Sequence, residues 1–181
     1  KVGVLSGNSY GFIGNRMMDP YGREAEHLLL EGATPRRIDD VLQRFGMAMG
    51  ILAVYDMAGV DVGYKVRQER KDQLPDDPGF YRASSMLVER GWLGQKTGRG
   101  WYDYREGAVA PTPDKNEERG RGIVGRVVVM LINEAADAVL FRVATAADVD
   151  RAMIKGVGYP KGLLEWADEI GIPGVVGRLA A

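Results

Sequence analysis

Apolar side chains recur every three or four residues along several stretches of the chain, and this spacing predicts amphipathic helices. The first stretch runs from Asn15 to Glu31. Gly32 follows it as a natural helix end, and Pro20 falls early enough for a helix to tolerate it. Its periodic positions are Met17, Met18, Tyr21, Ala25, Leu28 and Leu29. We therefore expect one long helix with a single buried face.

Further helices are expected along the rest of the chain. Thr34 before Pro35 is a typical helix start, because the threonine can cap the first turn and proline suits the first helical position. The expected helical ranges are 34–46, 51–57, 81–90, 124–140, 145–153 and 163–170. Residues 66–78 are charged and predict a solvated connection. Residues 91–104 are rich in glycine and aromatics and predict an ordered loop.

The two ends of the chain resemble each other, which indicates an internal duplication. Arg16 with Glu24 matches Arg126 with Glu134 at an offset of 110 residues. Similar matches continue at offsets of 111 and 112, which pair Thr34 and Asp39 with Thr145 and Asp150, and Gly46, Gly50 and Asp56 with Gly158, Gly162 and Asp168. Because each long helix alone would expose an apolar stripe, the two units are expected to pack face to face as a pseudo-dimer.

This repeat divides the chain into three parts. We predict a first helical unit at residues 1–106, a linker at 107–119 and a second unit at 120–181. The start of the chain, Lys1 to Ser6, alternates like the end of a strand and suggests a preceding domain. The predicted fold class is all-α: two tandem helical units, without a Rossmann domain.

Composition narrows the classes of function. A net charge of −1 argues against a nucleic-acid surface, which would carry a basic excess. The absence of cysteine excludes disulfides and thiolate chemistry. No apolar run approaches the ~20 residues that span a bilayer, so no membrane partner is expected.

Long ordered motifs resemble the C-terminal domain of the 3-hydroxyacyl-CoA dehydrogenase family. The family pattern Gly-Phe-x-x-Asn-Arg is met by Gly11, Phe12, Asn15 and Arg16. The loop GQKTGRGWYDY and the later segments LINEAADAV and GVGYPKGLLEWADEIG are also similar. The resemblance implies a fold like the C-terminal domain of 6-phosphogluconate dehydrogenase. It departs from the family at Ala48, where a proline is usual, and at Gly125, where the second unit has no copy of Asn15.

The resemblance also implies a function. Members oxidise (3S)-3-hydroxyacyl-CoA to 3-oxoacyl-CoA in fatty-acid β-oxidation and pass hydride to NAD. NAD, the catalytic histidine and its glutamate would belong to an upstream Rossmann-type domain that is absent here, so this chain alone should be inactive. The family's active-site asparagine matches Asn15, which we predict to be catalytic. The implied partners are the acyl-CoA substrate and either a second copy or a Rossmann domain. A cytoplasmic location is also expected, because the absence of cysteine fits a reducing compartment.

The chemistry of the candidate side chains allows further roles. Asn15 could also be a plain helix N-cap. Lys96 and Arg99 could bind a CoA phosphate, although loop cations are more often simply solvated. His27 lies off the predicted apolar face and is expected to face solvent in a structural role. Trp92, Trp101 and Tyr102 are expected to hold their loop to the core, and the aspartates repeated in both units, Asp39, Asp56, Asp150 and Asp168, to cap helices.

One glycine motif matches a dinucleotide-binding pattern but lacks the structural context that such a site needs. Residues Gly120–Gly125 spell G-x-G-x-x-G, which binds dinucleotides only between a buried strand and a helix. Here it follows a charged segment, so we predict a flexible lead-in to a helix and no NAD site. Two other functions stay open: a non-catalytic helical assembly module, and an unrelated helical binding protein.

Overall fold

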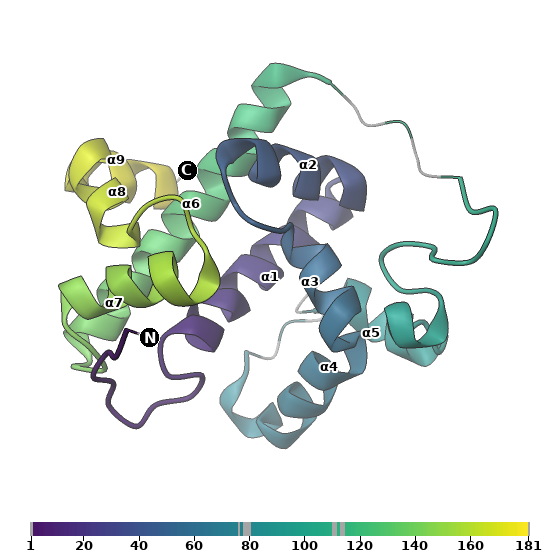
Figure 1. The fold of residues 1–181 in the computed structure, drawn as a ribbon, viewed down its shortest axis with the longest axis horizontal. Helices are drawn as coiled ribbons and strands as arrows, with labels where there is room; N and C mark the ends of the chain where they lie inside the picture. Colours follow the sequence, from purple (N-terminus) through teal and green to yellow (C-terminus); the bar gives the residue numbers. More distant parts are fainter. Residues whose placement is uncertain (1, 76, 78–80, 110–111, 113–114, 181) are drawn as a thin grey trace.

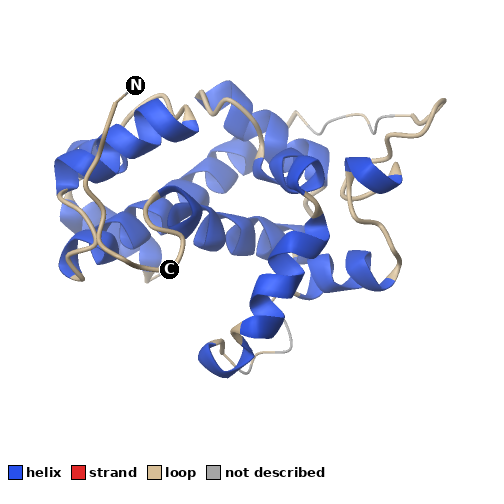
Figure 2. Ribbon diagram, turned by 60° about the horizontal axis from the view of Figure 1, so that its bottom comes forward, coloured by secondary structure: helices blue, strands red, loops and turns tan. Residues whose placement is uncertain are grey.

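The computed structural model describes residues 2–75, 77, 81–109, 112 and 115–180, and these form helices joined by loops (Figure 1; Figure 2). The described residues contain no β-strand, only isolated bridges in the loop at 94–103. The α-helices are α1 (Gly14–Leu30), α2 (Pro35–Phe45), α3 (Ile51–Ala58), α4 (Val60–Glu69), α5 (Arg82–Glu89), α6 (Glu117–Leu140), α7 (Ala146–Ala152), α8 (Leu163–Ile170) and α9 (Ile172–Leu179). The predicted all-α class is confirmed.

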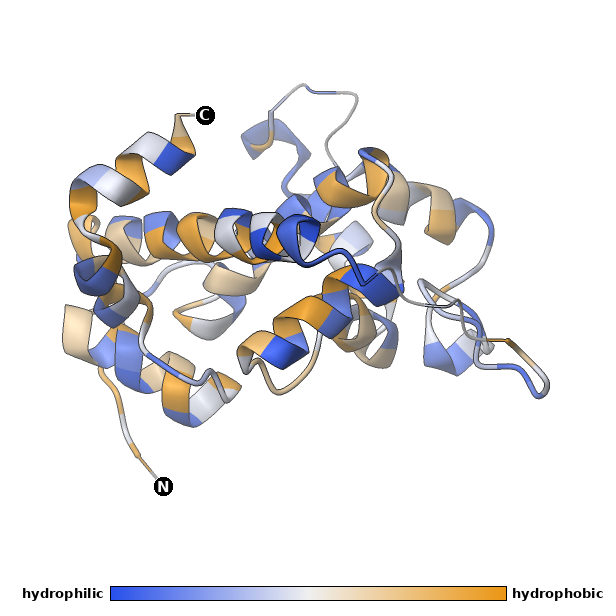
Figure 3. Ribbon diagram, turned by 90° about the horizontal axis from the view of Figure 1, so that it is seen from above, coloured by the Kyte–Doolittle hydropathy of each residue, from blue (hydrophilic) through white to orange (hydrophobic). Residues whose placement is uncertain are grey.

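Two long helices form the centre of the molecule. Helices α1 and α6 pack along each other, and the shorter helices gather around them (Figure 1). Apolar and polar positions alternate along the helices, as amphipathic packing requires (Figure 3). The core draws on both halves of the chain, with fully buried side chains at Met17, Ile38, Leu42, Leu52, Leu131, Met153 and Leu163. Neither half therefore has a core of its own.

Reciprocal ion pairs join α1 to α6. Arg16 Nε donates to Glu134 Oε1 at 2.5 Å, and Arg126 Nε donates to Glu24 Oε1 at 2.5 Å. Because these residues are the repeat-related arginines and glutamates, each unit offers the other the same pair of groups. That arrangement is the signature of a two-fold interface, so the predicted pseudo-dimer packing is confirmed.

The same capping device appears in both units. Asp39 accepts hydrogen bonds from the backbone N–H groups of Leu52 and Ala53 at the start of α3. Asp150 does the same for residues 164 and 165 at the start of α8. Gly50 and Gly162 make room for these carboxylates, because a Cβ there would lie 2.0 and 2.3 Å from the aspartate Cγ atoms. The capping role predicted for Asp39 and Asp150 is therefore confirmed.

The capping role predicted for the other two aspartates is wrong. Asp56 instead holds the 91–104 loop, accepting hydrogen bonds from the backbone N–H groups of Trp101 and Tyr102 at 2.9 Å and from the Tyr104 hydroxyl at 3.0 Å. Asp168 lies exposed on α8. Among the described residues 120–180, no loop lies against Asp168 as residues 101–104 lie against Asp56.

Two helices were not predicted. Helix α4 occupies part of 66–78, which was expected to be a solvated connection; Pro78 lies outside the described residues. Its few apolar positions, Val60, Val62 and Val66, suffice because α4 is short and packs mainly against α5. Helix α9 follows α8 after the sharp turn at Gly171, as α4 follows α3 at Gly59; both glycines have positive φ, 81° and 103°.

Helix α6 begins earlier than expected and absorbs the G-x-G-x-x-G motif. It starts at Glu117, capped by the Asn116 side chain, so the last residues of the predicted linker are helical. Residues 110, 111, 113 and 114 of that linker lie outside the described residues. The expectation of a flexible lead-in at Gly120–Gly125 is therefore wrong: enough helix-forming residues surround the glycines to carry the helix through them. The described residues 2–6 form no strand, and Lys1 lies outside the described residues.

If the G-x-G-x-x-G motif is only a part of helix α6, alanine should be tolerated at a glycine of the motif that has free space around it. A Cβ at Gly122 meets nothing within 4 Å, so Gly122→Ala should raise the free energy of unfolding by about 0.5–1 kcal/mol. Gly50→Ala is the control and should lower that free energy by about 3 kcal/mol because its Cβ would collide with Asp39. Urea unfolding followed by circular dichroism measures both. A lower free energy of unfolding in Gly122→Ala would contradict the conclusion that Gly122 is simply an interior residue of helix α6.

The reciprocal ion pairs should be coupled energetically. The Arg16–Glu134 pair is largely sheltered, with side-chain exposures of 19% and 21%, so a double-mutant cycle with Arg16→Met and Glu134→Leu should give a coupling of about 1–2 kcal/mol. The matched control is the exposed Arg36–Asp40 pair within α2, expected to couple by about 0.3–0.5 kcal/mol. Equal couplings for the two pairs would refute the special role of the α1–α6 contact.

Candidate functional site

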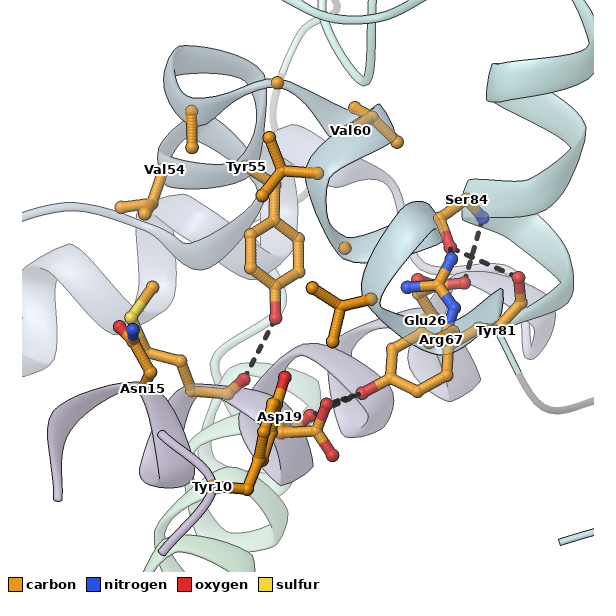
Figure 4. Close-up of a pocket in the computed structure, with 16 residues that line it drawn as sticks. Tyr10, Asn15, Asp19, Glu26, Val54, Tyr55, Val60, Arg67, Tyr81 and Ser84 are labelled. Atoms are coloured by element: carbon orange, nitrogen blue, oxygen red, sulfur yellow. Dashed lines mark hydrogen bonds between the residues drawn. The ribbon is translucent and has the colours of Figure 1, made fainter. Parts of the chain in front are cut away.

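A cavity of about 340 Å³ lies within the first unit (Figure 4). Residues of α1, α3, α4 and α5 line it, together with Tyr10 of the preceding segment. Its apolar walls are Met18, Val54, Ala58, Val60, Val62 and Val66, and its polar groups include Asn15, Asp19, Glu26, Arg67, Tyr81 and Ser84. The cavity therefore has mainly apolar walls that are interrupted by a few polar side chains.

Asn15 lines this cavity from the first turn of α1. The N-cap of α1 is Ile13, with no side-chain cap, so the N-cap reading of Asn15 is wrong. Gly11, with φ of 71°, turns the chain so closely that a Cβ would lie 2.5 Å from the backbone nitrogen of Arg16. This turn explains the Gly-Phe-x-x-Asn-Arg spacing: the glycine makes the turn, the arginine bonds to α6, and the Asn15 side chain stays exposed.

Tyr55 of α3 stands in the middle of the cavity in Figure 4. Its hydroxyl donates to the carbonyl oxygen of Met18 at 2.9 Å. It fills the space over Gly22, where a Cβ would lie 1.9 Å from that hydroxyl oxygen. Burial raises the pKa of Tyr55, so the ring is a neutral wall element rather than a base.

A hydrogen-bonded cluster closes the side of the cavity away from Asn15 (Figure 4). Glu26 Oε2 accepts from the backbone N–H of Ser84 at 2.9 Å, and Arg67 Nη2 donates to Ser84 Oγ at 2.9 Å. The Arg67 guanidinium lies 4.1 Å from the Tyr81 ring centre, and the Tyr81 hydroxyl donates to Asp19 Oδ1 at 2.8 Å. Desolvation raises the pKa of Glu26, while Ser84 and Arg67 oppose the shift.

The predicted phosphate-binding cations lie elsewhere. Lys96 forms an ion pair with Asp61, and its ammonium lies beside Gly59 at the edge of the cavity. The Arg99 guanidinium stacks on the ring of Trp92 at 3.7 Å and lines a separate hollow of about 410 Å³. Asn15, Lys96 and Arg99 therefore do not converge on one cavity.

Two of the three aromatic residues that were expected to hold the 91–104 loop to the core do so. Trp101 and Tyr102 pack against the core, and the Tyr102 hydroxyl also donates to Asp39 Oδ2 at 2.8 Å. Trp92 instead pairs with arginine. His27, expected to face solvent, is instead half-buried in the last turn of α1, and it does not line the cavity.

The Gly120–Gly125 motif does not offer a dinucleotide site, and the described residues contain no metal cluster. The backbone N–H groups at Gly122–Gly125 serve the interior of α6, and Gly120 packs against Arg37, leaving no cradle for a pyrophosphate. No group of three or more histidine, aspartate or glutamate residues in the described part could hold a metal ion. Within the same part, no helix combines the length and apolarity needed to cross a bilayer.

Sequence reasoning singled out Asn15, which lines the cavity, but missed the cluster opposite it. Glu26 is turned about 100° around the helix from the periodic position Ala25, so the apolar pattern did not mark it as buried. Arg67 and Ser84 gave no signal either, because they stand in segments read as a solvated connection and a short amphipathic helix. Their meeting with Glu26 depends on how α4 and α5 fold back onto α1.

Known proteins share this architecture. The family described as 3-hydroxyacyl-CoA dehydrogenase, C-terminal domain, matches residues 11–104 and 123–179. A 3-hydroxybutyryl-CoA dehydrogenase from Escherichia coli K12 aligns with a TM-score of 0.81 and 24% identity, covering 98% of this chain and 56% of that one. The dehydrogenase part of a multifunctional enzyme from C. elegans aligns with a TM-score of 0.68. These likenesses show a common fold.

Curated relatives are longer than this chain. The peroxisomal bifunctional enzyme of Danio rerio is 35% identical over 212 residues, which cover 99% of this chain and 30% of that protein. The fatty acid oxidation complex subunit alpha of Acinetobacter baumannii (strain SDF) is 30% identical over 195 residues, covering 95% of this chain and 27% of the relative. The family match spans both helical units and most of the chain. The chain therefore belongs to the 3-hydroxyacyl-CoA dehydrogenase C-terminal domain family.

Proposed function

We propose that this chain is the substrate-side and assembly part of an NAD-dependent (3S)-3-hydroxyacyl-CoA dehydrogenase of fatty-acid β-oxidation. The observation that carries the proposal is the position of Asn15, exposed on the wall of a largely apolar cavity, in a family whose relatives are fatty-acid oxidation and bifunctional enzymes. An acyl chain suits apolar walls. A side-chain amide has both donors and an acceptor, so it can orient a hydroxyl that becomes a carbonyl.

In this proposal, hydride transfer occurs in another part of the full-length enzyme. NAD, a general base and its partner carboxylate would come from a nucleotide-binding domain, because the described residues give no dinucleotide cradle and His27 lies off the cavity. Lys96 and Arg99 keep a secondary role as candidate contacts for a CoA phosphate outside the cavity. A cytoplasmic location stays a prediction, since the relatives include both peroxisomal and bacterial proteins.

An assembly role has its own support. Helix α9 exposes Ile172, Val176 and Leu179, which recur at helical spacing on one face. Such a face suits packing on a second copy or on a nucleotide-binding domain. If the chain were only an assembly module, Asn15 would be dispensable for turnover, and this separates the two functions.

Asn15→Ala in the full-length enzyme should lower kcat/KM for 3-hydroxyacyl-CoA about 100-fold, because an oriented hydrogen bond to the reacting oxygen is lost. Stability should change by no more than about 0.5 kcal/mol, since Asn15 is exposed and caps nothing. Asn116→Ala is the matched control: it removes the α6 cap, costs about 1 kcal/mol of stability and should leave turnover intact. Unchanged kcat/KM in Asn15→Ala would favour the assembly module.

The 181-residue chain by itself should neither bind NADH nor reduce acetoacetyl-CoA, because its described residues provide no site for the nicotinamide cofactor. The measurement is the absorbance of NADH over time in the presence of acetoacetyl-CoA and the purified chain. A steady loss of that absorbance above the protein-free rate would overturn the division of labour proposed here.

A further inference from the structure

A buried carboxyl group in the cavity wall lacks one partner. The Glu26 residue is only 2% exposed. Its Oε2 atom accepts from the Ser84 backbone N–H, whereas its Oε1 atom has no hydrogen-bond partner among the described residues. A buried polar atom without a partner costs free energy, so it marks a place where a ligand atom can contribute binding.

Glu26 lies on the same side of α1 as Asn15. Eleven residues separate them, which places them within about 20° of one helix face and about 16 Å apart along the axis. Both line the same cavity, and Tyr55 stands between them in Figure 4. A ligand whose reacting end lies at Asn15 and which follows this face of α1 passes Tyr55 and ends at Glu26.

The neighbouring charge does not satisfy Glu26. The Arg67 guanidinium donates to Ser84 Oγ and stacks on Tyr81, which occupies it at the edge of the cluster. The walls that lead to the cluster are apolar, with Val60, Gly63 and Val66 contributed by α4. The cavity is thus apolar along its length and polar at the end remote from Asn15.

A hydroxyl is the ligand group that best fits this end. It can donate to an ionised carboxylate and can accept from a neutral carboxylic acid, so it pairs with Glu26 in either state. An ammonium would bring a second positive charge to a cluster that already holds the Arg67 guanidinium, and nearby like charges repel each other. A methyl terminus would leave Oε1 unpaired, which is the situation in which polar sites reject an analogue that lacks the hydroxyl.

We propose that the Glu26–Ser84–Arg67 cluster is a recognition subsite for a hydroxyl group at the distal end of the acyl chain. The proposal rests on the proposed function, because Asn15 sets which end of the acyl chain reacts. It makes ω-hydroxyacyl thioesters, rather than purely alkyl ones, the preferred substrate class.

The test compares matched ligands on the full-length protein by isothermal titration calorimetry, without NAD. The probes are ω-hydroxyoctanoyl-, ω-hydroxydecanoyl- and ω-hydroxydodecanoyl-CoA, each against its unhydroxylated counterpart. For the chain length that reaches Glu26, the hydroxylated ligand should bind roughly tenfold more tightly, as one buried hydrogen bond gives. Equal or weaker binding of the hydroxylated ligand at all three lengths overturns the proposal.

Variants assign the preference to Glu26. Glu26→Met, which removes both oxygens at similar volume, should bring the two affinities within about twofold of each other. Glu26→Gln keeps a donor and an acceptor and should retain most of the preference, which guards against a Glu26→Met protein that fails to fold. Glu89→Met, an exposed position on α5 outside the cavity lining, is the control and should keep the full preference. A full preference in folded Glu26→Met contradicts the proposal.

The outcomes separate this proposal from the dehydrogenase function. Turnover of 3-hydroxyacyl-CoA with no preference for the ω-hydroxyl refutes the subsite alone. A Glu26-dependent preference in a protein without dehydrogenase activity supports the subsite and refutes the function. Failure of every acyl-CoA to bind contradicts both.

Discussion

The antiparallel contact between α1 and α6 is the feature on which the rest of the structure depends. Its reciprocal ion pairs join Arg16 to Glu134 and Arg126 to Glu24, and between them the two helices bury the centre of the core. Every shorter helix is then positioned relative to this pair. Because α1 also carries Asn15 and Glu26, the contact that holds the units together also fixes the wall of the cavity.

The sequence predicted features that depend on local rules or on repetition. Thr34 and Thr145 cap their helices as expected, accepting from the N–H groups three residues on, because capping requires only neighbouring residues. The repeat predicted the pseudo-dimer because two units with matching residues should fold alike and should each bury an apolar helix face against the other. Helix α4 was missed because its charged composition resembles a loop, and its helical state depends on packing against α5.

The residues of the candidate site also fall into those that local sequence predicts and those that only tertiary packing brings together. Asn15 was singled out through a motif whose glycine turn is local, and the alternative that it is a plain N-cap was wrong because α1 begins earlier, at Gly14. Lys96 and Arg99 were grouped with it through chemistry alone, whereas their positions depend on an ion pair to Asp61 and on stacking against Trp92. The Glu26 cluster joins three helices far apart in sequence, so no local pattern could have assembled it.

Because one polypeptide carries both units, their contact does not depend on the protein concentration. A symmetric dimer of separate subunits dissociates when it is diluted, since its interface forms between molecules. Here the same kind of interface joins two parts of one polypeptide, whose tether keeps them at an effective concentration of roughly millimolar or more. The α1–α6 contact therefore persists at any protein concentration, and the second unit supports α1, with the cavity wall that α1 carries, at every dilution.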